Sequence, residues 1–257
     1  MQTISNIAIV GAGNAAHHFA KAFLQLNHVT VIIYSRSAEQ GKLLAKSVGV
    51  RFKPLTDLTS TNHDLVLLAV ADNAIATVSK LAPENALVVH CSGATSMHTI
   101  DSNNKGVFYP LQTMSKDKTV DFSNIPILIE TDSAEHYTLL ETLAKKLSSK
   151  VYPMSSEQRL KLHLAAVFAC NFSNFMMVCA QSYLEKEQIP FEILHKLITE
   201  TAEKAIQIGP NKSQTGPAVR GDENVLQLHE GLLENEPELL HLYQTISNLI
   251  KSQHGIV

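Results

Sequence analysis

Apolar residues between Asn6 and Tyr152 form short β-branched runs that alternate with longer stretches of helical periodicity. This alternation is typical of βαβ units, and continuous apolar runs are expected in strands that helices cover on both faces of a mostly parallel sheet. The predicted strands are Ile7–Val10, Val29–Tyr34, Leu65–Val70, Leu87–Cys91, Gly106–Tyr109, Ile125–Ile129 and Lys150–Tyr152. The predicted helices are Asn14–Leu26, Ala38–Val48, Asn73–Leu81 and Ala134–Leu147.

The β pattern ends at Pro153, and the rest of the chain has helical periodicity except for one loop rich in glycine and proline. We therefore predict two domains, residues 1–153 around a sheet and residues 154–257 all helical. Ser155 and Gln158 form a capping-box pattern at the start of a helix of about 30 residues. Further helices are predicted at Phe191–Ile208, Glu223–Glu234 and Pro237–Lys251.

The long helix is apolar nearly all round between Leu164 and Ala180, so other elements must bury it. The remaining helices offer little surface for this, and we expect a second copy of the chain to supply part of the cover. Asn171, Ser173 and Asn174 interrupt the apolar run, which we interpret as too polar and too short for a membrane span.

Composition excludes several classes of protein. The chain is 45% hydrophobic and 18% charged, which is typical of a globular protein and not of a disordered one. Its formal charge of −3 provides no field for binding nucleic acid, so a small-molecule partner is favoured. The three cysteines form no C-x-x-C pair and the N-terminus has no signal-peptide pattern, so we expect a cytoplasmic protein.

A glycine turn joins the first predicted strand to the first predicted helix. Gly11, Gly13 and Ala16 satisfy G-x-G-x-x-A, the pattern of dinucleotide-binding sites. Gly11 permits the tight turn, Gly13 lets the backbone approach a pyrophosphate, and the helix N-terminus faces the anion. The alternative is a turn that binds no ligand. The residues predicted to bind the cofactor here are Gly11, Ala12, Gly13, Asn14 and Ala15.

The end of the second strand distinguishes the two nicotinamide cofactors. A carboxylate at this position binds the ribose 2′-hydroxyl of NAD, whereas a cation accommodates the 2′-phosphate of NADP. Arg36 stands at the expected spacing, and neither Asp nor Glu occurs between Val29 and Ala38. We therefore predict NADP (NADPH), although Arg36 as a solvated residue before the next helix is the alternative. The predicted contacts are Tyr34, Ser35, Arg36 and Ser37.

Residues that follow the later strands are expected to face the nicotinamide, because ligands of open α/β sheets lie outside the carboxyl ends of the strands. The alternatives are that Asp72 only caps a helix and that Ser92 and Gly93 form a plain turn. Nothing in the sequence lowers the pKa of Cys91, so we do not expect it to be a nucleophile. The predicted residues are Val70, Ala71, Asp72, Cys91, Ser92 and Gly93, with Tyr109 and Pro110 after the next strand.

Several segments resemble known families. The run GAGNAA at 11–16 resembles the opening of pyrroline-5-carboxylate reductases and deazaflavin-linked NADP reductases, a distant similarity. The segments HCSGA at 90–94, YPLQT at 109–113, HLAAVFACN at 163–171 and TGPAVRGD at 215–222 resemble an uncharacterised family of NADP oxidoreductases. This resemblance covers essentially the whole chain, and TGPAVRGD is its most specific element. It implies a Rossmann domain, a C-terminal helical domain of unknown function similar to the dimerisation domains of 6-phosphogluconate dehydrogenase-like enzymes, and a homodimer, but no substrate.

Polar residues of the helical domain are the candidates for catalysis. On a regular helix His163 and Asn174 lie about 20° apart in azimuth, with Asn171 nearby. Imidazole is the side chain best suited to general acid–base catalysis, which makes His163 the candidate proton donor. In the loop Lys212–Asp222, Thr215, Arg220 and Asp222 surround two glycines, and Arg220 can clamp a carboxylate.

These polar residues also have structural interpretations. The histidine and asparagines of the long helix can pair with caps and carbonyls, Arg220 can form an ion pair with Asp222, and Asp222 can cap the next helix. The remaining histidines lack metal-ligand spacings, so no metal site is expected.

The leading hypothesis is an NADP-dependent oxidoreductase that moves hydride to or from a small polar carbonyl or imine in a crevice between the domains. A carboxylate on the substrate is compatible with the clamp that Arg220 can form. One alternative is an NADP-binding regulator without turnover. Another is a hydroxyacid dehydrogenase, which is disfavoured because these enzymes place a lysine four residues before an asparagine. Here Lys161 is followed at that spacing by Ala165, and Asn171 is preceded by Val167.

Overall fold

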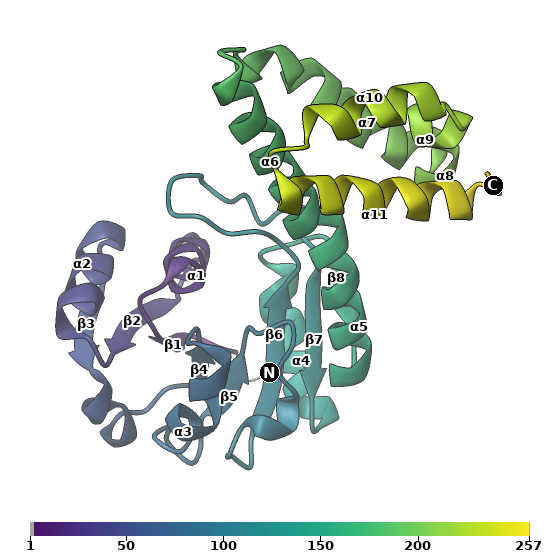
Figure 1. Cartoon of the computed structure of the whole chain (residues 1–257). Helices are drawn as coiled ribbons and strands as arrows, with labels where there is room; N and C mark the ends of the chain where they lie inside the picture. Colours follow the sequence, from purple (N-terminus) through teal and green to yellow (C-terminus); the bar gives the residue numbers. More distant parts are fainter. Residues whose placement is uncertain (1–2, 257) are drawn as a thin grey trace. The chain divides into compact units, whose positions relative to one another are not determined.

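The computed structural model describes residues 3–256, so the expectation about a signal peptide involves two residues, Met1 and Gln2, that lie outside the described part. The chain forms two compact units, Met1–Val167 and Phe168–Val257 (Figure 1). The first unit extends past residue 153, where the sequence predicts the boundary, and includes the helix α5 (Ser156–Ala166).

The first unit is built on an eight-stranded sheet in the order β3-β2-β1-β4-β5-β6-β7-β8. Every neighbouring pair is parallel except β6 and β7, which confirms the predicted mostly parallel, doubly wound sheet. The edge strand β3 was not predicted, because Arg-Phe-Lys-Pro contains no apolar run. The strands are β1 (Asn6–Val10), β2 (Thr30–Ser35), β3 (Arg51–Pro54), β4 (Leu65–Leu68), β5 (Leu87–His90), β6 (Lys105–Pro110), β7 (Ile127–Thr131) and β8 (Val151–Pro153).

Alternate residues of each central strand enter two different cores. Ile7 and Ile9 pack with α1 (Asn14–Leu24), α2 (Ala38–Val48) and α4 (Ala134–Lys145) on one face. Ala8 and Val10 pack on the other face with α3 and η1. Burial on both faces explains why these strands are continuously apolar. The elements not yet given bounds are α3 (Ile75–Ser79) and the 3₁₀ turns η1 (Leu55–Ser60), η2 (Asp72–Ala74) and η3 (Met97–Thr99).

The reversed strand β7 brings an acidic residue to the end of β5. Val107 of β6 pairs with His90 on one side and with Glu130 on the other. Strand β8 runs parallel to β7 and leads into α5, whose N-terminus has the predicted capping box. Ser155 Oγ accepts from the Gln158 amide at 3.3 Å, and Gln158 Oε1 accepts from the Ser155 amide at 3.1 Å. The first turn of α5 therefore lies beside Glu130 and the loop that follows β5.

The predicted long helix is interrupted by a π-helical turn, η4 (Val167–Phe172), between α5 and α6. Helices α9, α10 and α11 of the second unit pack against one another (green to yellow in Figure 1). The segment expected to be an extended loop contains the short helices α8 and α9, each of which begins at a proline that favours the first helical position. The elements are α6 (Ser173–Lys186), η5 (Phe191–Leu194), α7 (His195–Ile208), α8 (Pro210–Ser213), α9 (Pro217–Arg220), α10 (Glu223–Leu232) and α11 (Pro237–Gln253).

Residues Ser156–Lys186 form a helical run that is long and apolar enough to cross a membrane, with a mean hydropathy of 1.5 over its most apolar window. Core helices of soluble proteins have the same length and composition, but none of this window is buried within the chain. The large apolar side chains that it exposes are Leu160, Leu164, Phe168, Phe172, Phe175 and Val178. By length and mean hydropathy the run meets the requirement for a membrane span, which contradicts our interpretation of the apolar stretch 164–180 as too polar and too short.

Candidate functional site

A cavity of about 570 Å³ lies where β1, β2 and β4 end. The strand order reverses between β1 and β4, which is the position where doubly wound sheets bind ligands. The predicted residues that line the cavity are Gly11, Ala12, Gly13, Ser35, Arg36, Ser37, Val70 and Ala71. Residues that line it without having been predicted include Gln40, Leu55, Asn73, Ala74 and Val78.

The two glycines of the turn have different structural roles. Gly11 has a φ of +131°, and a Cβ there would overlap the backbone carbonyl of Ala69. Its amide donates to Tyr34 O at 2.8 Å, which holds the turn against β2. A Cβ on Gly13 would have no atom within 4 Å, so this residue borders open space. Gly11 thus shapes the turn, while Gly13 leaves the room that a phosphate group of a dinucleotide requires, and the turn fits such a cofactor.

The residues at the end of β2 are placed differently from one another. The Arg36 side chain is exposed and has no hydrogen bond or ion pair within residues 3–256, so it is available to an anion. Ser37 Oγ accepts from the Gln40 amide at 3.3 Å and caps α2. Tyr34 turns its hydroxyl into the core, 2.9 Å from His63 Nε2. The backbone carbonyl of Tyr34 accepts from the Gly11 amide of the glycine turn.

Neither of the last two predicted residues of the turn lines the cavity. Asn14 Nδ2 donates to Met114 O at 2.9 Å, which ties the first turn of α1 to the loop after β6. Ala15 is half-buried against the core.

Asp72 connects the cavity to the loop after β5. Its carboxylate accepts from Ser92 Oγ at 2.9 Å, and its neighbours Ala71 and Asn73 line the cavity. The helix-cap interpretation of Asp72 is wrong, because Ala71 and Ala74 occupy the cap positions of η2 and α3. Burial raises the pKa of the adjacent Cys91 to about 12, so its thiol stays protonated at neutral pH and is a poor nucleophile.

His163, on α5, faces the loop after β5. A Cβ on Gly93 would lie 2.5 Å from His163 Nδ1 and 2.9 Å from Tyr109 Cζ, so the three residues are in close contact. The Tyr109 hydroxyl is 3.4 Å from His163 Nδ1. Burial raises the pKa of Tyr109, although the charge of Arg159 acts in the opposite direction. This arrangement forms a half-buried phenol–imidazole pair that can hold a proton at the carboxyl end of the sheet.

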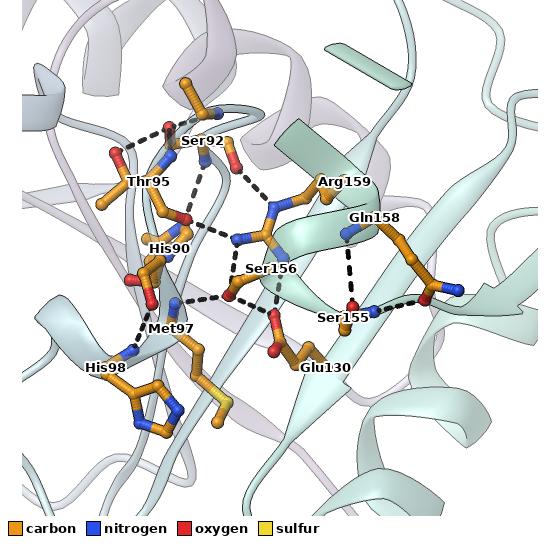
Figure 2. Close-up of polar contacts among 12 residues, drawn as sticks. His90, Ser92, Thr95, Met97, His98, Glu130, Ser155, Ser156, Gln158 and Arg159 are labelled. Carbon is orange, nitrogen blue, oxygen red and sulfur yellow. Dashed lines mark hydrogen bonds and ion pairs between the residues drawn. The ribbon is translucent and has the colours of Figure 1, made fainter. Parts of the chain in front are cut away.

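Arg159 is the residue that sequence reasoning missed. It lies on α5 with 1% exposure, and Figure 2 shows its guanidinium among groups from the loop after β5 and from β7. Nη1 donates to Glu130 Oε2 at 2.7 Å and Nε donates to Ser92 O at 3.2 Å, while Nη2 donates to Thr95 O. No sequence signal marked Arg159, because it falls among polar residues of a helix start.

His90 is fully buried beside this network. The Ser92 amide donates to His90 Nδ1 at 3.2 Å, and His90 Nε2 lies 3.3 Å from Ser96 O. Burial, followed by the charge of Arg159, lowers the pKa of His90 to about 4. The ring is therefore neutral at physiological pH and serves as a fixed link in the loop.

Asn171 and Asn174 belong to the second unit, and both are exposed with no side-chain hydrogen bond in the described part of the chain. The π turn also invalidates the azimuth argument for His163 and Asn174, because its i→i+5 bonds abandon the regular 100° per residue. The functional interpretation assumed that both asparagines are buried and therefore need hydrogen-bond partners. In the described part of the chain their side chains are exposed instead, so that argument no longer applies to them.

The candidates of the loop 212–222 are placed separately. Thr215 borders an apolar cavity of about 380 Å³ that is lined by second-unit residues. Arg220 lies 3.9 Å from Asp222, and Asp222 caps α10 by accepting from the Val225 amide at 3.4 Å. Both contacts agree with the alternative interpretation, in which Arg220 pairs with Asp222 and Asp222 caps the next helix. No group of three or more potential metal ligands occurs within residues 3–256, and the expectation of no metal remains a prediction.

The chain is similar to two known protein families and to a solved structure. Residues 6–92 match the NADP oxidoreductase, coenzyme F420-dependent family, and residues 125–250 match a domain of unknown function, DUF2520. A Bacteroides fragilis protein named a putative NADP oxidoreductase is 39% identical, with a TM-score of 0.89 over 97% of this chain and 98% of that one. No curated protein matched the sequence.

Two further structures share the fold. A Thermotoga maritima protein is 23% identical, with a TM-score of 0.72 over 97% of this chain and 98% of that one. A pyrroline-5-carboxylate reductase from Streptococcus pyogenes is 16% identical, with a TM-score of 0.64 over 96% of this chain and 98% of that one. The resemblance that the sequence motifs indicated is confirmed, and the chain belongs to the family of NADP oxidoreductases in which a Rossmann domain is followed by the DUF2520 domain.

Proposed function

We propose that the protein is an NADP(H)-dependent oxidoreductase that moves hydride to or from a small polar carbonyl or imine. The observation that carries this proposal is the cavity at the point where the strand order of the sheet reverses. It is lined by Gly13, which borders open space, and by Arg36, whose side chain has no ion-pair partner within residues 3–256. The pyrophosphate lies on the glycine turn, and Arg36 binds the 2′-phosphate.

When bound, NADPH supplies the hydride, and the protein aligns and polarises the reacting groups. Asp72 and the loop Ser92–Thr95 connect the rim of the cavity to Tyr109 and His163, because Asp72 accepts from Ser92 and Gly93 contacts both rings. This region is where the nicotinamide half of the cofactor is expected.

Reduction of a carbonyl or imine also requires a proton at the oxygen or nitrogen, and the Tyr109–His163 pair provides it. Nδ1 of His163 faces the Tyr109 hydroxyl, while Nε2 has no hydrogen-bond partner within residues 3–256. A substrate heteroatom bound at Nε2 receives its proton from the imidazole, whose second nitrogen stays next to the phenol. Contacts of the substrate with Asn171, Asn174, Thr215, Arg220 or Asp222 stay predictions.

The same proposal includes a homodimer formed by the second unit. Phe172 at the end of η4 and Phe175 and Val178 of α6 are exposed apolar side chains that no other part of residues 3–256 covers. Exposed apolar patches of this kind mark interfaces between proteins or with membranes. We propose a second copy as the cover, because the resemblance of the C-terminal domain to dimerisation domains implies it and Asn171 and Asn174 disfavour lipid contact.

The cofactor proposal is tested by titrating NADPH and NADH calorimetrically into the wild type, Arg36→Ala and Lys46→Ala. Lys46 is an exposed cation on α2 that does not line the cavity. Lys46→Ala is therefore the control, because it removes one positive charge, as Arg36→Ala does, without changing the cavity. A charge-assisted hydrogen bond contributes about 1.5–3 kcal/mol, so wild type and Lys46→Ala should bind NADPH at least about tenfold more tightly than NADH. Arg36→Ala should lose this preference. Equal affinities in the wild type would refute the NADP assignment.

A further inference from the structure

Arg159 is a buried charge that donates to two backbone carbonyls, those of Ser92 and Thr95, and to the side chains of Glu130 and Ser156. Its side chain is 1% exposed, and its ion-pair partner Glu130 is 15% exposed. Burial alone would raise the pKa of Glu130, but hydrogen bonds from Ser156 and Arg159 outweigh it and hold that pKa below its usual value. The pair is therefore ionised, and Arg159 carries a full positive charge inside the protein.

The guanidinium holds both ends of the loop Ser92–Thr95. Nε donates to Ser92 O at 3.2 Å, and Nη2 donates to Thr95 O. Inside the loop the amides of Ala94 and Thr95 donate to Ser92 Oγ at 3.2 and 3.0 Å. These bonds fix Gly93, the residue that contacts His163 and Tyr109.

Arg159 also fixes the helix that carries His163. The two residues are four positions apart on α5 and so lie on the same helix face. Ser156, one turn earlier, donates to Glu130 Oε2 at 2.7 Å and accepts from the Met97 amide at 2.9 Å. A single guanidinium thus ties the loop after β5 to α5, the helix that carries His163. Figure 2 shows the polar contacts of this guanidinium with Glu130, Ser92 and Thr95.

We propose that Arg159 is a positioning residue that holds the loop Ser92–Thr95 and His163 in the geometry required by the nicotinamide half of NADPH. This inference rests on the proposed function. It assigns to Arg159 no contact with the cofactor, because the donors of its guanidinium are directed at Glu130, Ser92, Thr95 and Ser156. Buried ion pairs often add little net stability compared with apolar replacements, so stability alone is a weak reason for this arrangement.

The inference predicts that losing Arg159 weakens binding of one half of the cofactor and spares the other. The fragment 2′,5′-ADP lacks the nicotinamide and binds only the glycine turn and Arg36. The ratio of its dissociation constant to that of NADPH therefore measures what the nicotinamide half contributes. A residue that served only the fold would change both dissociation constants together and leave this ratio unchanged.

The experiment measures both dissociation constants by calorimetry in the full chain carrying Arg159→Lys, Arg159→Met or Glu130→Gln. Lys161→Met is the matched control, because Lys161 is an exposed cation on the same helix. Lysine keeps the charge but cannot reproduce the planar fork of donors. We expect the ratio to fall about tenfold in Arg159→Lys, which corresponds to about 1.4 kcal/mol, and further in Arg159→Met. Glu130→Gln should lower it less, and Lys161→Met not at all.

The outcomes separate this inference from the proposed function. If the wild type binds neither NADPH nor 2′,5′-ADP, the proposed function fails. If the wild type binds both but the ratio is unchanged in the variants that still bind 2′,5′-ADP, Arg159 is purely structural and the inference is overturned. If neither Arg159 variant folds, Glu130→Gln is the test, because it keeps an acceptor for Arg159 and removes only the charge. An unchanged ratio of the two dissociation constants in Glu130→Gln also overturns the inference.

Discussion

Adding one methyl group at Gly11 should destabilise the protein, whereas adding one at Gly13 should block the cofactor. In Gly11→Ala the new Cβ would overlap Ala69 O and lie 2.8 Å from the Ala69 carbonyl carbon, at a φ of +131°. Such a backbone conformation costs about 1–3 kcal/mol for a residue other than glycine, and overpacking adds about 1–3 kcal/mol. Because native proteins are stable by about 5–15 kcal/mol, this loss is a large share of the total.

Gly13→Ala should affect cofactor binding and leave the stability of the fold nearly unchanged. Gly13 has a φ of −84° and no atom within 4 Å of an added Cβ, so the substitution introduces neither strain nor a clash. Alanine restricts the unfolded chain, which contributes about 0.4–1 kcal/mol, and this offsets the somewhat poorer cap that it gives α1. The net change in stability should be near zero. The methyl group nevertheless occupies the space through which a pyrophosphate would approach the backbone.

The two variants are compared by thermal unfolding and by NADPH titration. We expect Gly11→Ala to melt at least about 5 °C below the wild type. Gly13→Ala should melt with the wild type but bind NADPH at least about tenfold more weakly, a loss of about 1.4 kcal/mol. Wild-type affinity in a folded Gly13→Ala would refute the placement of the cofactor in this cavity, and wild-type stability of Gly11→Ala would refute the packing argument.

The remaining predictions concern the proton donor, pH and assembly. With an active carbonyl or imine found by screening, His163→Asn and Tyr109→Phe should each lower the rate of NADPH oxidation by about 10²–10⁴-fold. Both variants should keep the wild-type melting temperature and NADPH affinity. If His163→Asn instead unfolds early and the protein that stays folded keeps full ligand affinity, His163 belongs to the core. Because the pKa of buried His90 is lowered to about 4, the unfolded chain binds more protons between about pH 6.5 and 4, and the free energy of unfolding should fall by up to about 3 kcal/mol as the pH decreases through that range. His90→Gln should flatten this part of the curve, and an unchanged slope in urea titrations would contradict the assignment. Light scattering at micromolar concentration should give twice the chain mass, while a monomer, or binding to lipid vesicles, would refute the second copy as cover for α6.

The parts of the fold that were predicted correctly are those with long apolar runs. Strands β1, β2, β4 and β5 are buried on both faces, so nearly every residue in them is apolar and the run itself marks the strand. Strand β3 lies at the edge with half-exposed polar residues, and α8 and α9 are too short for periodicity to reveal them. The π turn has no sequence signature.

The candidate site shows the same division. The glycine turn and Arg36 were found because the backbone conformation and the phosphate charge each require a particular residue type. Arg159 and the pairing of Tyr109 with His163 depend on contacts between residues more than 50 positions apart. The sequence reveals the residue types at such positions but not which of them meet. The reversal of β7, which brings Glu130 to Arg159, was likewise not visible in the pattern.

The sheet ends later in the chain than the Rossmann family match does. The DUF2520 match begins at residue 125 and so includes β7, β8 and α5. These three elements nevertheless fold with the first unit. Glu130 and Arg159 come from that segment, whereas the carbonyls of Ser92 and Thr95 lie upstream of it. Exchanging the N-terminal halves of two relatives would therefore pair a loop from one parent with a guanidinium from the other. Chimaeras joined between residues 96 and 124 should therefore work only when both parents carry matching partners at this contact.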